Sequence, residues 1–542
     1  MVIGKDRSHG IVLSFVRGTD MEVKGGFVRN WAGAWRAMIH PRVIGMLFFG
    51  FSAGIPLLLI FSSLSLWLRE AGADRTEVTF FSWAALAYSF KFVWAPLVDR
   101  LPVPYLSRRL GRRRSWLLLA QVSVICAICC MALIDPAAGP HSLTLMAVAA
   151  VFLGFSSATQ DIVIDAYRIE AADQNLQAMM SSSYIAGYRI GMIVAGAGAL
   201  LLANYFGTEL GAYQYDAWRS TYLIMAMAMS VGLITTLTVS EPVRGSDTFH
   251  AFSVYENFRF LLLFFAAVGA FVVVFFASSD IVDRIEMPTN EQIMLIPIVR
   301  FLGEAARLLI AIIAGVFVAV VFVRIGLVNP ILLQESYLAP LADFFNRYRL
   351  KVAILLLALI GLYRISDIVL GVIANVFYQD LGFSKVEIAT VVKTFGLIMT
   401  IAGGFLGGIL AARYGIMRVL FLGAVLTVLT NLLFMYQAYI GYDLTVFYFV
   451  ISADNLSGGL ASAAFVAFLS SLTSVSFTAV QYAIFSSLMT LLPKLLGGYS
   501  GAMVEALGYP HFFLIASLMG LPVLVLIGFA GRLLAEVRPQ GS

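Results

Sequence analysis

The chain has 542 residues, of which 60% are hydrophobic and only 12% are charged, and its mean hydropathy is +0.90. Soluble proteins carry about 25% charged residues, so this composition excludes a soluble globular protein and indicates an integral membrane protein. Lys and Arg number 36 against 31 Asp and Glu. These charges lie in short loops between apolar runs, which is typical of membrane topology and not of a nucleic-acid partner.

Residues 1–42 are polar and basic, and they contain no run long enough for the core of a signal peptide. The segment 30–42 carries Trp31 and Trp35 and ends just before the first long apolar run. Its pattern predicts an interfacial helix that leads into the first membrane span.

Runs of about 20 apolar residues can each cross the bilayer as a helix. We therefore predict an all-α polytopic membrane protein with about fourteen transmembrane helices. In chain order the predicted spans are 43–68, 78–98, 115–134, 143–166, 181–203, 218–239, 259–279, 303–323, 351–377, 386–411, 417–438, 444–470, 478–500 and 511–531.

The distribution of basic residues predicts the orientation. If the N-terminus is cytoplasmic, roughly two thirds of the Lys and Arg residues fall in cytoplasmic segments. The densest cluster, RRLGRRR at 108–114, follows the second span. We therefore expect both termini to face the cytoplasm.

The spans divide into six, two and six, because polar stretches at 241–250 and 335–351 separate a helix pair from its neighbours. This division predicts a cytoplasmic N-terminal segment, a six-helix bundle, a linker with an inserted helix pair, a second six-helix bundle and a cytoplasmic tail. The corresponding bounds are 1–42, 43–240, 241–350, 351–532 and 533–542.

A basic turn follows the second helix of each set of six, at 95–114 and at 407–418. Two parallel six-helix repeats of this kind resemble the plan of the major facilitator superfamily of secondary transporters. The superfamily's motif combines a Gly, an Asp-Arg pair and a later run of Arg. The matching residues are Asp99, Arg100, Gly111, Arg112 and Arg113. Their spacing is stretched by LPVPYLS, and a basic cytoplasmic loop that only obeys the positive-inside rule is the alternative.

Ionisable residues inside spans are rare and mark functional sites. Asp161 and Asp165 lie four apart in SSATQDIVIDAYR and therefore share one face of a helix. Lys91 and Arg189 lie at a compatible depth, within ~15 Å of the cytoplasmic ends of their spans, so the four charges can pair with one another. Ion pairs such as Asp165 with Arg168 can also serve only to dock helices.

In the second half, Arg364 and Asp367 are three apart near the middle of a span, and Asp454 lies inside another. A docking ion pair is again the alternative for Arg364 and Asp367. A coupling carboxylate must gain and lose a proton, and burial and a nearby cation shift its proton affinity in opposite directions. Asp161, Asp367 and Asp454 are therefore the predicted proton-coupling residues. No phosphate-binding loop is present, so we expect an ion gradient to supply the energy.

Several segments resemble the AmpG family of muropeptide permeases, over most of 43–240 and 350–530. They are FKFVWAPLVDR (90–100), GRRRSWLL (111–118), SATQDIVIDA (157–166), GYRIGM (187–192), LGFSKVEIATVVKTFGLIMTIAGGFLGGIL (381–410), DNLSGGLASAAFVAFL (454–469) and FTAVQYAIFSSL (477–488). The inserted pair at 259–323 and the N-terminal segment have no matching block.

The resemblance implies import of anhydromuropeptides (N-acetylglucosaminyl-anhydro-N-acetylmuramyl peptides) from periplasm to cytoplasm, driven by the proton gradient. It also implies a role in peptidoglycan recycling and β-lactamase induction and a place in the bacterial inner membrane. We expect a monomer in the lipid bilayer, with a small-molecule substrate, no nucleic acid and no cofactor.

The polar residues of these segments predict the site, since amides and Tyr suit sugar hydroxyls while Lys and Arg suit peptide carboxylates. The predicted substrate-binding residues are Lys91, Gln160, Asp161, Tyr188, Arg189, Lys393, Asn455 and Gln481. The predicted gating residues are Asp99, Arg100, Arg112, Asp165 and Arg168. Asp165 is expected to pair with Arg168 or with the basic turn, and Asp161 to serve the substrate or the proton.

Two other functions compete with this interpretation. The first is a related carrier for another organic anion, acetyl-CoA-like or peptide-like. The second is a membrane enzyme that acts on lipid-linked sugars. It is disfavoured because only five His occur, none beside a pair of acids, and such an enzyme would need clustered catalytic groups in a large aqueous loop. We therefore expect no enzymatic activity.

Overall fold

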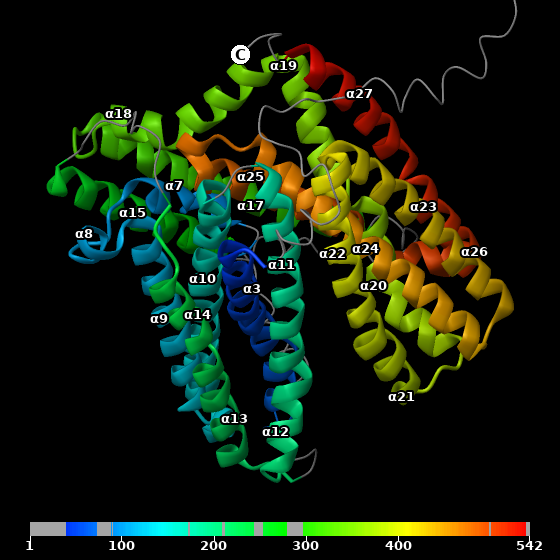
Figure 1. The fold of residues 1–542 in the computed structure, drawn as a ribbon. Coiled ribbons are helices and arrows are strands. Elements are labelled where there is room, and N and C mark those ends of the chain that lie inside the picture. Colours follow the sequence, from blue (N-terminus) through cyan, green and yellow to red (C-terminus); the bar gives the residue numbers. More distant parts are fainter. Residues whose placement is uncertain are drawn as a thin grey trace, which may run out of the picture. The chain divides into compact units, whose positions relative to one another are not determined.

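The computed structural model describes residues 39–72, 88, 90–171, 174–208, 212–242, 253–278, 296–497 and 500–537 (Figure 1). Within these ranges the regular structure consists of helices. The predicted interfacial helix lies outside the described residues except for its last few positions. The first span begins where Pro41 occupies the first turn of a helix and His40 caps it by accepting a hydrogen bond from the Arg42 backbone N–H.

The first set of helices contains both long spans and short connecting pieces. They are α3 (Pro41–Leu58), η1 (Leu59–Ser63), α4 (Leu64–Glu70), η3 (Lys91–Val93), α7 (Ala95–Arg100), α8 (Leu106–Leu110), α9 (Arg112–Ala132), η4 (Pro136–Ala138), α10 (Pro140–Ala171), α11 (Gln174–Ile193), η5 (Val194–Gly198), α12 (Ala199–Tyr205), α13 (Tyr215–Ala228) and α14 (Ser230–Thr238).

The second set begins with α19, which is interrupted at Arg349 by non-helical backbone angles. The set comprises α19 (Ala339–Leu362), α20 (Ile365–Asp380), α21 (Lys385–Ile388), η7 (Ala389–Phe395), α22 (Gly396–Tyr414), α23 (Ile416–Ile440), α24 (Leu444–Leu472), η8 (Val475–Phe477), α25 (Thr478–Gly497), α26 (Ser500–Leu518) and α27 (Leu521–Val537). In chain order, four further elements follow the first set and precede the second: α15 (Val254–Ala277), α17 (Ile296–Arg324), α18 (Pro330–Leu333) and η6 (Gln334–Leu338).

The chain forms two compact units. One unit holds Met1–Val98, Pro102–Gly245 and Phe344–Ser542, and the other holds Ser246–Asp343 together with Asp99–Leu101. The second unit therefore joins the inserted helices to three residues of the basic turn. Within it, Arg100 Nη1 lies 2.8 Å from Glu335 Oε2.

Eleven of the predicted spans are found, among the described residues, as helices long and apolar enough to cross a membrane. The other three differ for separate reasons. About half of 78–98 lies outside the described residues, and the spans predicted at 303–323 and 478–500 overlap the shorter apolar stretches Leu309–Arg324 and Val475–Thr490. The all-α membrane class is confirmed.

Glycines let α3 and α11 approach until their backbones touch. A Cβ atom at Gly50 would lie 2.1 Å from the carbonyl oxygen of Tyr184, and one at Gly187 would lie 1.9 Å from that of Leu47. Gly54 repeats the contact one turn along, against the carbonyl oxygen of Tyr188. Small residues at a helix interface permit this packing, and here it fixes the face of α11 that carries the tyrosines.

Glycines also permit close helix packing in the second set, where those of GGFLGG lie on two faces of α22. Gly403 and Gly407 lie against the backbone of α24, where a Cβ would be 2.0 Å from Leu456 O and 2.7 Å from Leu460 O. Gly408 lies instead against α11 of the first set, where a Cβ would be 2.0 Å from Ser182 Oγ. One glycine-rich segment therefore packs a helix inside its own set and against the other set.

Two π-helical segments, η1 and η5, lie side by side in the first set. A π-turn frees backbone carbonyls from the regular hydrogen-bond ladder, and a buried carbonyl needs a partner. Ser63 Oγ donates to Ala195 O at 2.7 Å, and Tyr222 Oη donates to Leu59 O at 2.9 Å. These side chains stabilise irregular backbone inside the membrane.

Candidate functional site

Asp161 is a buried carboxylate that no cation pairs with among the described residues. It lies on α10 and is 8% exposed. Its described hydrogen-bond partner is Tyr184, whose Oη lies 3.5 Å from Asp161 Oδ1. The close packing of α3 and α11 positions this tyrosine. Buried charges are usually paired with an opposite charge, so the carboxylate of Asp161 is a candidate functional group.

Asp165, one turn further along α10, is held by two cations. Its Oδ1 lies 3.1 Å from Arg168 Nη2 and its Oδ2 lies 3.7 Å from Lys91 Nζ. The side chains of all three residues are less than 10% exposed. Lys91 therefore pairs with Asp165, and among the described residues no ion pair joins it to Asp161. Asp165 also pairs with Arg168, one of the two partners expected for it, and no residue of the basic turn pairs with it in the described part of the chain.

Arg168 also links the two sets of helices. It is fully buried, its Nη2 donates to Ser470 Oγ on α24 at 3.3 Å, and its guanidinium carbon lies 5.0 Å from the centre of the Tyr482 ring on α25. A guanidinium stacks on an aromatic ring by cation–π attraction. The predicted gating residue thus contacts helices of the opposite set.

Tyr188 and Arg189 follow Tyr184 along α11, and both are half-buried. The neighbouring charges that act on Arg189 are those of Arg364 and Asp367 in the second set. The sequence predicted that Arg189 could pair with the acids of its own set. Among the described residues no ion pair joins Arg189 to those acids, and the acid whose charge acts on it is Asp367 of the second set.

Arg364 and Asp367 form an ion pair at a helix break, with Nη2 and Oδ2 2.5 Å apart. α19 ends at Leu362, and α20 begins at Ile365 with Asp367 in its first turn, where the helix dipole favours a carboxylate. Hydrogen bonds fix both sides of the break: Tyr363 Oη donates to Leu420 O at 3.1 Å, and Ser366 Oγ donates to Ala516 O at 2.5 Å. Broken helices of this kind form binding sites in secondary transporters.

Asp454 and Asn455 lie on α24. Asp454 has a hydrogen-bonding contact with Thr430, and the charge that acts on it is the carboxylate of Asp367. Asn455 Oδ1 accepts a hydrogen bond from Thr400 at 2.8 Å, and its Nδ2 donates to Ile451 O. The Asn455 amide thereby ties α22 to α24.

Two predicted substrate-binding amides are engaged within the protein. Gln160 is buried on α10, and its Nε2 lies 3.5 Å from Ser52 Oγ. Gln481 Oε1 accepts from Arg347 Nη2 at 2.9 Å and from the Ser474 backbone N–H at 2.7 Å. The side chain of the remaining predicted residue, Lys393, lies outside the described residues.

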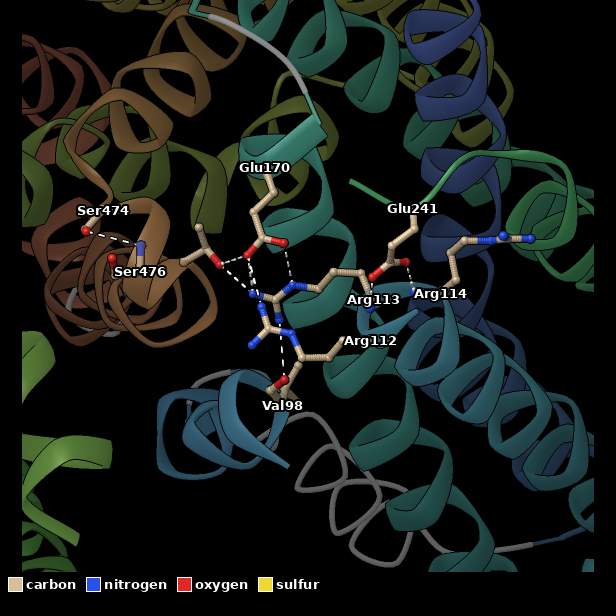
Figure 2. Close-up of polar contacts among 9 residues, drawn as sticks. Val98, Arg112, Arg113, Arg114, Glu170, Glu241, Ser474 and Ser476 are labelled. Carbon is tan, nitrogen blue, oxygen red and sulfur yellow. Dashed lines mark hydrogen bonds and ion pairs between the residues drawn. The ribbon is translucent and has the colours of Figure 1, made fainter. Parts of the chain in front are cut away.

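The basic turn and the end of α10 form a second polar cluster, shown in Figure 2. Arg113 binds Glu170 through two nitrogens, with Nε 2.9 Å from Oε2 and Nη2 2.5 Å from Oε1. Arg112 Nη2 lies 3.4 Å from the same carboxylate. Thr478 Oγ1, on α25 of the second set, lies 2.6 Å from Glu170 Oε1 and 2.5 Å from Arg113 Nη2. The cluster therefore joins the two sets.

The start of α9 is anchored by Glu241 (Figure 2). Its carboxylate accepts hydrogen bonds from the backbone N–H groups of Arg113 at 2.8 Å and Arg114 at 3.0 Å. A carboxylate at a helix N-terminus satisfies free N–H groups and the dipole together. Gly111 precedes this turn with φ +86°, and a Cβ there would meet the Glu241 side chain at 2.4 Å.

Glu170 and Thr478 were not predicted from the sequence, and Arg113 was predicted only as a residue of the superfamily motif. One signal was available: three consecutive arginines at a membrane boundary require an acid at the same depth. Glu170 lies at the end of the fourth predicted helix, on the side of the basic turn. Asp99, a predicted gating residue, is buried, and Arg100 pairs with Glu335 as described above.

Two repeated helix sets with charges buried between them define a polytopic membrane carrier. The sequence model of the Major Facilitator Superfamily matches residues 43–363, more than half of the chain. The chain belongs to this superfamily.

Named relatives confirm the resemblance to the AmpG permeases. The anhydromuropeptide permease of Escherichia coli K12 is 29% identical over 91% of this chain and 80% of its own length. A protein of Rickettsia felis that bears the name AmpG 4 is 28% identical over 91% of this chain and 97% of its own length.

Solved structures share the fold. A proton:xylose symporter bound to 6-bromo-6-deoxy-D-glucose matches with a TM-score of 0.54 and 12% identity, over 91% of this chain and 94% of that one. The fucose:proton symporter of E. coli matches with a TM-score of 0.55 and 11% identity, over 91% and 99% of the two chains.

Proposed function

We propose that the protein imports anhydromuropeptides from periplasm to cytoplasm by alternating access, coupled to protons. The observation that carries the proposal is the similarity to the anhydromuropeptide permease of E. coli, which extends over 91% of this chain. The buried polar residues support it. Tyr184 and Tyr188 offer hydroxyls to sugars and amides, and Arg189 offers a guanidinium to a peptide carboxylate.

Asp161 and Asp454 are the residues we propose for proton coupling, one in each set. Neither has an ion-pair partner among the described residues, whereas Asp165 has two. Asp165 is held by Lys91 and Arg168, so we assign it to the ion-paired cluster and not to proton coupling. Asp367, the third predicted coupling residue, can take this role only when Arg364 releases it.

The clusters around Arg168 and Glu170 are the proposed gate. Both join the two sets of helices near the basic turn, which the charge distribution assigns to the cytoplasmic side. In this arrangement the carrier is closed toward the cytoplasm. Transport requires these contacts to break when the substrate-loaded carrier opens on that side.

The test is uptake of radiolabelled anhydromuropeptide by right-side-out inner-membrane vesicles, with and without a protonophore. We expect uptake against a gradient, and we expect the protonophore to abolish accumulation. A matched control is Arg219→Gln, since Arg219 lies at the surface with a side chain 46% exposed. Accumulation that survives collapse of the proton gradient would disprove proton coupling.

Failure to take up any muropeptide would instead favour a related carrier for another organic anion. The same vesicles distinguish the two outcomes when they are supplied with labelled di- and tripeptides or with acetyl-CoA. Uptake of one of these, with none of the muropeptide, replaces the proposed substrate while leaving the carrier function in place.

A further inference from the structure

A cluster of uncharged polar side chains is buried in the core of the first set of helices. It consists of Ser52 on α3, Gln121 on α9, Gln160 on α10 and Thr236 on α14, and all four residues are 0% exposed. α3 and α9 each pack against both α10 and α14. A polar atom without a hydrogen-bond partner costs free energy in such surroundings, so each polar atom of this cluster needs a partner.

Hydrogen bonds within the protein satisfy only part of the cluster. Ser52 Oγ donates to Phe49 O at 2.9 Å, and Thr236 Oγ1 donates to Gln121 Oε1 at 2.8 Å. Gln160 Nε2 lies 3.5 Å from Ser52 Oγ. Two amide atoms, Gln121 Nε2 and Gln160 Oε1, have no hydrogen-bond partner among the described residues. The first of these atoms is a donor and the second is an acceptor.

Both amides approach the hydroxyl of Ser52. The Cβ position built on Gly232 of α14 lies 2.7 Å from Ser52 Oγ and 3.0 Å from Gln121 Nε2. These two polar atoms therefore lie close to one point, and one small molecule can contact both. Because residue 232 is a glycine, α14 places no Cβ atom at that point. The amide of Gln160 reaches the same hydroxyl from α10.

We propose that one water molecule is bound in this cluster, where it accepts a hydrogen bond from Gln121 Nε2 and donates one to Gln160 Oε1. Water both donates and accepts, so one molecule satisfies the two atoms together, and Ser52 Oγ offers it a third contact. A cation would be repelled by the amide N–H group of Gln121, and an anion would be repelled by the amide oxygen of Gln160. The mixed donor and acceptor set therefore selects water over an ion.

The bound water gives Gln160 a role other than substrate binding. It links α10 to α9 inside the first set, where the side chain of Gln160 is fully buried. The water site does not depend on which substrate is transported, so it goes beyond the proposed function and can be tested without a substrate.

Solid-state NMR on the full-length chain in lipid bilayers tests for the water directly. Gln121 is the one glutamine of the sequence that follows an alanine, so pairwise isotope labelling identifies its signals without a substitution. The protein is perdeuterated and carries protons on its N–H groups. We expect magnetisation from water to reach the side-chain amide of Gln121 several-fold faster than its backbone N–H, which lies inside α9.

A double-mutant cycle tests whether Gln121 and Gln160 share one ligand. Gln121→Met or Gln160→Met alone leaves the other amide without its partner, whereas the double substitution removes both polar groups. We therefore expect the double variant to unfold at a higher temperature than the two single shifts predict together. Gln437→Met combined with Gln160→Met is the matched control. Gln437 is equally buried but lies on α23 of the second set, and distant substitutions have additive effects.

Three results would overturn the proposed water bridge. The first is transfer of magnetisation to the Gln121 side chain that is no faster than transfer to its backbone. The second is transfer that stays fast in Gln160→Met, because the water would then be bound elsewhere. The third is a pair of shifts in unfolding temperature that are as additive as those of the control pair. The first comparison uses the unmodified protein, so it decides the question where a variant does not fold.

Discussion

Asp161 and Asp165 show that two carboxylates one helical turn apart can have opposite chemistry. Asp165 neutralises Lys91 and Arg168, whereas Asp161 contacts only a tyrosine hydroxyl among the described residues. The sequence could predict that both residues are functionally important, because ionisable residues are rare inside apolar spans. Their partners were not predictable, because pairing depends on how far each of three helices is shifted along its axis. The two carboxylates share one face, so a shift of α10 by ~6 Å, the rise of four residues, would exchange one for the other.

We predict that Asp161→Asn abolishes transport without loss of folded protein. The amide keeps the shape of the carboxyl group but cannot gain or lose a proton. Vesicle uptake of the labelled muropeptide measures the activity, and detergent size-exclusion chromatography measures the folded fraction. Uptake at the unmodified rate would remove Asp161 from the site.

Asp165→Asn is the contrasting prediction. It leaves Lys91 and Arg168 buried without their counter-ion, and breaking a buried ion pair from one side costs ~3–5 kcal/mol. We expect a lower unfolding temperature and reduced abundance in the membrane. A thermal unfolding curve equal to that of the unmodified protein would show that solvent reaches this cluster.

At the level of helices, the sequence predicted packing glycines but not the surfaces they contact. GGFLGG contains two overlapping small-residue pairs, and the structure assigns Gly403 and Gly407 to α24 and Gly408 to α11. The spacing of the glycines along the sequence does not show which neighbouring helix packs against which face of α22. The fourth span shows a related limit: hydropathy ended it at 166, whereas α10 continues to Ala171 and buries Arg168 completely.

Gly408→Ala should hold α11 and α22 apart. Its Cβ would lie 2.0 Å from Ser182 Oγ and 2.8 Å from Ser182 Cβ, so the two sets of helices must separate by a small distance. We expect slower uptake and a destabilisation of ~1–3 kcal/mol. The matched control is Gly404→Ala, whose Cβ meets its nearest atoms at 3.9 Å. Equal effects of the two substitutions would contradict the assignment of faces.

At the scale of the whole carrier, the two sets of helices are joined by few polar contacts, and Thr478 provides one of them. The sequence could predict two bundles and a basic turn from repetition and charge. It could not predict which residues of the second bundle meet that turn, because they lie about 365 positions away and docking alone brings them together.

Thr478→Val tests this contact with minimal change in shape. It removes the hydroxyl that reaches Glu170 and Arg113 from α25 and leaves the Arg113–Glu170 pair intact within the first set. We expect thiol reagents to reach Ser470→Cys faster from the side of the basic turn, by several-fold. Thr490→Val serves as the control, because the described hydrogen bond of Thr490 Oγ1, to Ser487 O, lies within its own helix.

The continuity of α10 has a kinetic consequence. Asp161, Asp165, Arg168 and Glu170 all lie on this one unbroken helix, within ~14 Å along its axis. A tilt of α10 displaces the coupling acid, the ion-paired cluster and the end that meets the basic turn in a single motion. Events at the two depths cannot then have independent rate constants, and rapid-mixing records from probes placed at either depth should follow one shared exponential.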